Sequence, residues 1–131
     1  MATYTLRWQL TGPSGVVNVE KELTAEGYAE IPSVSIANGQ TDKSVIFTVD
    51  VSQTVAFEIV SDQDVTVETN SGTPGPTVDT IALKANIPYR WCTNWYTAFK
   101  LTQDVVTGLF ITNASGSAAI LQVRHLYDST P

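Results

Sequence analysis

The chain has 131 residues, of which 15% are charged and 43% hydrophobic, and its formal net charge is −6. This acidic balance argues against binding to phosphate backbones or to anionic membrane surfaces, because both would repel the chain. The length fits one domain over residues 1–131, and the single cysteine, Cys92, has no partner for an internal disulfide.

The first half of the chain alternates apolar and polar residues, which is typical of strands with one face buried. The alternation runs over residues 4–10, 45–51 and 55–59. Turn signals separate these segments: residues 11–15 contain Gly-Pro-Ser-Gly, and residues 37–40 contain an Asn-Gly pair. The pattern therefore predicts strands from the beginning of the chain.

The second half continues the same pattern. The alternation that indicates strands lies at residues 65–68, 109–111 and 119–127. The turn signals lie at residues 62–64, 70–76 and 113–117. Residues 93–104 are the least regular stretch, where we expect a long loop or one helical turn. The spacing predicts nine or ten strands and almost no helix.

Many short strands with little helix predict an all-β fold, and we expect an antiparallel two-sheet β-sandwich of the jelly-roll type. An immunoglobulin-like sandwich is the alternative, although the Cys…Trp…Cys pattern that would favour it is missing. Two positions are open for the first strand, which either pairs with the last strand or lies at a sheet edge.

No group of residues forms a recognisable catalytic or metal site. His125 is the only histidine and lies on an apolar strand face, where a packed side chain is more common than a base or a ligand. Cys92 has no histidine or basic neighbour at helical spacing that would lower its pKa. Asp62, Asp64 and Glu68 lack the spacing of a calcium loop. We therefore expect no enzyme activity, no cofactor and no metal.

The feature that indicates binding is a cluster of aromatic residues within an eleven-residue segment. The candidate interface residues are Tyr89, Trp91, Trp95, Tyr96 and Phe99. One interpretation is that these side chains close one end of the core. The other is an exposed aromatic patch that contacts a protein surface or stacks on sugar rings.

The C-terminal half resembles a known family. The segments that carry the resemblance are Asp79-Thr80-Ile81-Ala82-Leu83-Lys84-Ala85-Asn86-Ile87-Pro88-Tyr89-Arg90-Trp91, Leu109-Phe110-Ile111-Thr112-Asn113-Ala114-Ser115-Gly116 and the run from Ala119 to Pro131. They are similar to head decoration (cement) proteins of tailed bacteriophages. The similarity covers roughly residues 78–131, and the first half matches only in being rich in strands.

The resemblance implies a non-enzymatic protein that binds the outer surface of an icosahedral shell and stabilises it. Its partners would be the major capsid protein and neighbouring copies of itself, with trimers as one form of assembly. Its location would be the capsid exterior of the virion. The N-terminal segment shows no basic region followed by an apolar stretch, so we expect synthesis in the host cytoplasm without a signal peptide.

Two other functions remain open. The first is a carbohydrate- or receptor-binding module of a phage tail fibre or baseplate, which would use the aromatic cluster as its contact surface. The second is a tail-tube or connector role.

Overall fold

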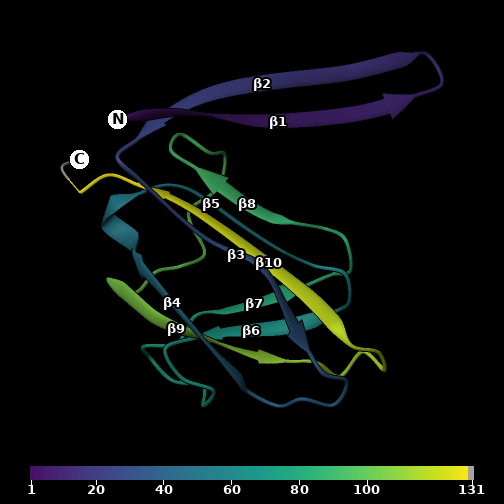
Figure 1. The fold of residues 1–131 in the computed structure, drawn as a ribbon, viewed down its shortest axis with the longest axis vertical. Helices are drawn as coiled ribbons and strands as arrows, with labels where there is room; N and C mark the ends of the chain where they lie inside the picture. Colours follow the sequence, from purple (N-terminus) through teal and green to yellow (C-terminus); the bar gives the residue numbers. More distant parts are fainter. Residues whose placement is uncertain (130–131) are drawn as a thin grey trace.

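The computed structural model describes residues 1–129, which form ten strands and one 3-10 turn, η1 (Val51–Gln53) (Figure 1). The last two residues of the C-terminal run that carries the family resemblance lie outside the described residues. The strands are β1 (Ala2–Gly12), β2 (Gly15–Ala25), β3 (Gly27–Ile36), β4 (Lys43–Asp50), β5 (Thr54–Ser61), β6 (Val65–Thr69), β7 (Thr80–Leu83), β8 (Tyr89–Cys92), β9 (Val105–Thr112) and β10 (Ala119–Tyr127).

Eight of these strands form two antiparallel four-stranded sheets packed as a sandwich. One sheet has the order β3-β10-β5-β8 and the other the order β4-β9-β6-β7. The chain passes back and forth between the sheets, and its last strand lies between β3 and β5. This strand order is that of a jelly roll. The predicted fold class is confirmed, and the immunoglobulin-like alternative is wrong.

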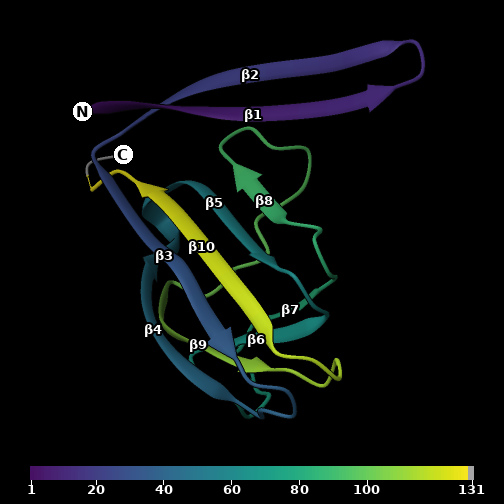
Figure 2. The ribbon, with the colours of Figure 1, turned by 45° about the vertical axis from the view of Figure 1, so that its right-hand side comes forward.

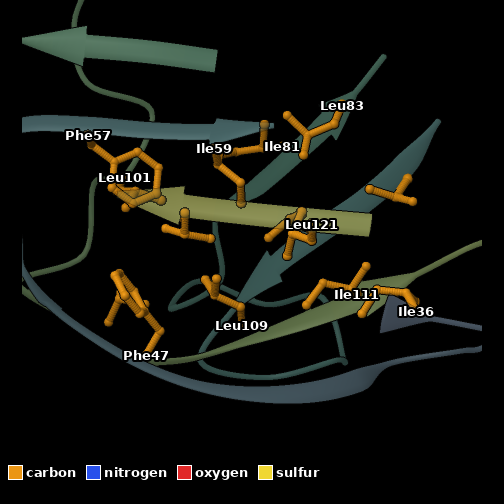
Figure 3. Close-up of a cluster of buried hydrophobic side chains, with 14 of the residues drawn as sticks. Ile36, Phe47, Phe57, Ile59, Ile81, Leu83, Leu101, Leu109, Ile111 and Leu121 are labelled. Carbon is orange, nitrogen blue, oxygen red and sulfur yellow. The ribbon is translucent and has the colours of Figure 1, made fainter. Parts of the chain in front are cut away.

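The core lies between the two sheets and is filled by every second residue of the strands, as the alternation predicts. Phe47 and Val49 of β4 face Phe57 and Ile59 of β5, and all four are buried. Figure 3 shows Phe47, Phe57 and Ile59 with side chains of the neighbouring strands meeting in one cluster. Burial of each such side chain contributes about 1.5–3 kcal/mol, so this cluster holds the sandwich together.

The first two strands form a sheet of their own, which we call the arm (residues 2–25). They pair from Ala2 with Ala25 to Gly12 with Gly15. The first strand does not pair with the last one; β1 pairs with β2 and with no strand of the sandwich, so it lies at an edge of this two-stranded sheet. Figures 1 and 2 show the arm crossing one end of the sandwich, with its tip projecting beyond β8.

The outer face of the β3-β10-β5-β8 sheet explains where the arm lies. One cross-strand row is mostly apolar and consists of Tyr28, Leu126, Ala56 and Cys92. The next row alternates in charge and consists of Glu30, Arg124, Glu58 and Arg90. Two ion pairs lie in it, Arg90 Nε with Glu58 Oε2 at 2.6 Å and Arg124 Nε with Glu30 Oε2 at 3.5 Å. The arm lies over the apolar row, and most of the charged row lies beside the arm and not beneath it.

Candidate binding site under the arm

The apolar face of the arm is buried at its root. Leu23 and Ala25 of β2 are 7% and 0% exposed and pack on Ala56, Cys92 and Leu126. Apolar contact of this kind needs no charge or hydrogen bond to hold, which suits the uncharged row beneath it. The root therefore positions the rest of the arm relative to the sandwich.

The same face is uncovered at the tip. Trp8 pairs with Val19 and Leu10 with Val17, so these four side chains share the face that carries Leu23 at the root. Leu10 is 74% exposed, Val17 65% and Val19 50%. A patch of several exposed apolar residues marks a contact surface more often than a single exposed apolar residue does.

The loop after β8 approaches the arm from the body. The rings of Trp8 and Trp95 stack with their centroids 5.6 Å apart and their planes 22° apart. Lys21 Nζ donates a hydrogen bond to the Thr93 carbonyl at 3.4 Å. Tyr96, beside the stack, is 99% exposed. The arm and this loop thus present their aromatic and apolar side chains to the same side.

An open groove of about 520 Å³ lies between the arm and the loop, and we call it the arm groove. Its lining residues are Trp8, Val19, Lys21, Cys92, Asn94, Trp95 and Tyr96. Burial raises the pKa of the Cys92 thiol, which works against a reactive thiolate there. Because its walls are mainly apolar and aromatic, the groove is suited to an uncharged protein surface.

A smaller cavity of about 120 Å³ lies between the arm root and the sheet, and we call it the aromatic cavity. Its aromatic lining includes Tyr4, Trp8, Tyr28, Trp91 and Trp95. Charged side chains from the border row, Glu58, Arg90 and Arg124, also line it. The cavity is therefore a ring-sized space with stacking surfaces and polar groups on one side.

The five predicted interface residues fall into two groups. Trp91 and Phe99 stack at 4.6 Å, and Trp91 Nε1 donates to the Thr97 carbonyl at 3.1 Å. Tyr89 packs on the core with Phe99, and its hydroxyl accepts from the Lys100 amide at 2.9 Å. These three residues close the β8 side of the sandwich, whereas Trp95 and Tyr96 belong to the arm groove.

His125 lies inside the sandwich, 2% exposed, with Nε2 3.0 Å from Thr54 Oγ1. Burial lowers its pKa to about 4, with a smaller opposing effect from Asp50. The Asp50 carboxylate instead accepts hydrogen bonds from the Ser52 amide and hydroxyl. His125 is therefore a neutral core residue at pH 7.

Two of the carboxylates considered for calcium accept hydrogen bonds from different backbone amides. Asp62 Oδ1 accepts from the Ile120 amide at 2.7 Å, and Asp64 Oδ1 from the Ala85 amide at 2.9 Å. Within residues 1–129, no three histidine, cysteine or acidic side chains gather as a metal site. No helix in this part of the chain is long and apolar enough to cross a bilayer.

The sequence interpretation missed the arm tip, including Leu10, Val17 and Val19. A signal was present, because residues 8–19 contain no charged side chain although the chain carries 20 charged residues. Three valines in this segment also follow a Gly-Pro-Ser-Gly turn, as expected for a hairpin.

Comparison with known proteins adds little to this description. No protein-family model and no curated protein matches the chain. The solution NMR structure of a de novo designed double-stranded beta-helix is similar, with 11% identity over 74% of this chain and 97% of that chain, at a TM-score of 0.40. The jelly-roll assignment depends on the strand order described above.

Proposed function

We propose that this chain is a non-enzymatic decoration protein, which binds the outer surface of an icosahedral phage shell in many copies and stabilises it. The observation that carries the proposal is the arm groove, an open space with mainly apolar and aromatic walls beside the exposed ring of Tyr96. A rigid jelly roll that presents such a groove, with aromatic side chains along it, is suited to docking on another protein.

Charge and repetition are compatible with this role. The net charge of −6 keeps a densely decorated particle soluble. A contact surface as small as the arm groove gives weak binding for one copy. Many copies on a symmetric shell are retained by avidity when neighbouring copies also touch one another. The resemblance of residues 78–131 to decoration proteins supports a phage shell as the surface that is bound.

The test uses shells that lack the protein, mixed with purified wild-type or variant chain and then sedimented. Tyr96→Ser removes the most exposed ring of the arm groove and is expected to reduce binding about tenfold or more. Ile46→Ser is the matched control, because Ile46 is 88% exposed but lies on β4, in the other sheet. Wild-type chain that does not sediment with shells would contradict the proposal, as would shells whose heat stability is the same with and without it.

A second candidate function is carbohydrate or receptor binding, favoured by the aromatic cavity. Sugar rings stack on aromatic side chains and accept hydrogen bonds from arginine, and Trp95 and Arg90 line this cavity. A glycan-binding screen of the wild type and of Trp95→Ala tests it. Glycan binding that is lost in the variant would favour this function over the decoration role, and absence of binding would remove it.

A further inference from the structure

The arm tip is a two-stranded sheet that projects from the body (Figure 2). It has an uncovered apolar face. Two-stranded hairpins without a packing partner are marginally stable in water. Both of its strands also have one edge that pairs with no other strand among residues 1–129. Such a tip gains stability from any surface that covers Leu10 and Val17.

The charge distribution favours the arm tip as the place where two copies of the chain meet. In the arm, Arg7 and Lys21 balance Glu20 and Glu22, so the whole net charge of −6 lies on the remainder of the chain. Two copies that approach body to body therefore repel each other. Two copies that approach through uncharged residues 8–19 avoid most of this repulsion.

We propose that the arm tips of two copies bind each other, with the apolar face of each tip packed on that of the other. In the expected arrangement the two arms run antiparallel about a two-fold axis, which makes the contact self-complementary. Leu10 and Val17 of each copy then pack on the same two residues of the other copy.

The size of the contact sets its expected strength. Residues 8–12 of one strand span about 17 Å and two strands about 10 Å, so a tip face measures roughly 200 Å². This is well below the roughly 800 Å² per partner of a stable complex. The free protein should therefore pair weakly, and close spacing on a surface would strengthen the pairing.

Sedimentation equilibrium of the full chain tests the proposal between about 10 μM and about 1 mM. The average mass of the wild type should rise from 14.2 kDa towards twice that value. Added salt should strengthen the association, because it screens the repulsion between the two acidic bodies. Amide NMR shifts that change with concentration should fall in residues 8–19.

Two neighbouring valines provide a matched pair of variants. Val17 and Val16 are 65% and 52% exposed and lie on opposite faces of β2, because Val16 pairs with Thr11. Val17→Asp should remain monomeric at about 1 mM, and Val16→Asp should associate like the wild type. Leu10→Thr, which keeps a good strand former on the apolar face, should also weaken association, and it replaces Val17→Asp if that variant unfolds.

The proposal is overturned if the wild type stays monomeric at about 1 mM, or if Val16→Asp and Val17→Asp reduce association equally. These measurements contain no shell, so a failure of shell binding leaves their result intact. Conversely, a monomeric wild type that sediments with shells would overturn the pairing of arms and support the decoration role.

Discussion

The indole of Trp8 in the arm stacks on the indole of Trp95 in the body, with centroids 5.6 Å apart. Trp8 is on the apolar face between the buried root and the uncovered tip. The stack therefore lies where the arm leaves the support of the sandwich, and it holds the arm at a defined distance from the loop after β8.

Trp95→Ala is expected to loosen the arm without unfolding the jelly roll. An aromatic pair contributes about 0.5–1.5 kcal/mol beyond its buried area, so local opening of the arm should increase roughly 2–10-fold. Hydrogen exchange of the β1 and β2 amides measures this change. Tyr96→Ala is the control, since Tyr96 is 99% exposed. Equal exchange in wild type and Trp95→Ala would show that the stack does not hold the arm.

Asn113→Ala is expected to destabilise the fold by about 2–4 kcal/mol. The Asn113 side chain is fully buried, and Nδ2 donates to the carbonyls of Ile36 at 3.0 Å and Ser117 at 2.8 Å. Its Oδ1 accepts from the Ser115 hydroxyl at 2.7 Å. Urea unfolding measures the loss, with Asn18→Ala as the control because Asn18 is exposed on the arm. A loss as small as that of the control would contradict this role.

The stability of the protein should fall as the pH drops from 6.5 towards 4, because of His125. Burial lowers the pKa of His125 in the folded state from 6.5 to about 4, so folding favours its neutral form. This contribution to stability is complete above pH 6.5, the pKa of His125 in the unfolded state. It is lost as the imidazole takes up a proton at lower pH. The free energy of unfolding should be about 2 kcal/mol lower at about pH 5 than at about pH 7.

Urea unfolding at these two pH values measures the effect, and His125→Gln is the comparison because it removes the only imidazole. The variant should be less stable at neutral pH, since Thr54 loses its ring partner. Its stability should nevertheless change little between the two pH values. If the variant loses as much stability between the two pH values as the wild type does, the effect comes from titratable groups other than His125.

Gly27→Ala is expected to disturb the junction between arm and sandwich. Gly27 begins β3 and pairs with Tyr127, and a Cβ at this position would overlap the Tyr127 ring. That ring stacks on His125 at 5.3 Å, so its displacement should cost about 1–3 kcal/mol. Thermal unfolding measures the cost, with Gly75→Ala as the control because a Cβ there meets open space. Similar midpoints for the two variants would argue against close packing at Gly27.

The alternation of residues predicts the sandwich because one face of each strand is buried. Segments 45–51, 55–59 and 119–127 correspond to β4, β5 and β10, and their apolar positions form the core. The arm shows the limit of this signal. Residues 4–10 alternate just as regularly, and the pattern is the same whether a face lies on a core or projects beyond it.

The aromatic cluster could not be divided from the sequence for a different reason. Trp91 and Trp95 are four residues apart, but the chain turns between them, where Asn94 adopts a φ of 66° and the Trp95 amide donates to the Cys92 carbonyl. This turn sends Trp91 to Phe99 and Trp95 to Trp8. Whether each ring packs on the body or on the arm depends on where the arm lies.

Side chains alone attach the arm to the sandwich. Within residues 1–129, no backbone-to-backbone hydrogen bond joins residues 2–25 to the two sheets, whereas β10 is bonded on both sides by β3 and β5. The hydrogen bonds between arm and body come from side chains, from Arg90 to the Arg7 carbonyl and from Lys21 to the Thr93 carbonyl, both at 3.4 Å. Swinging the arm away would therefore break no ladder of the jelly roll. Its energetic cost would be mainly apolar area returned to water, together with the hydrogen bonds of Lys21 and Arg90, and another apolar surface can offset the larger part of that loss. The arm and the jelly roll are thus mechanically separable units, connected through the short link between Ala25 and Gly27.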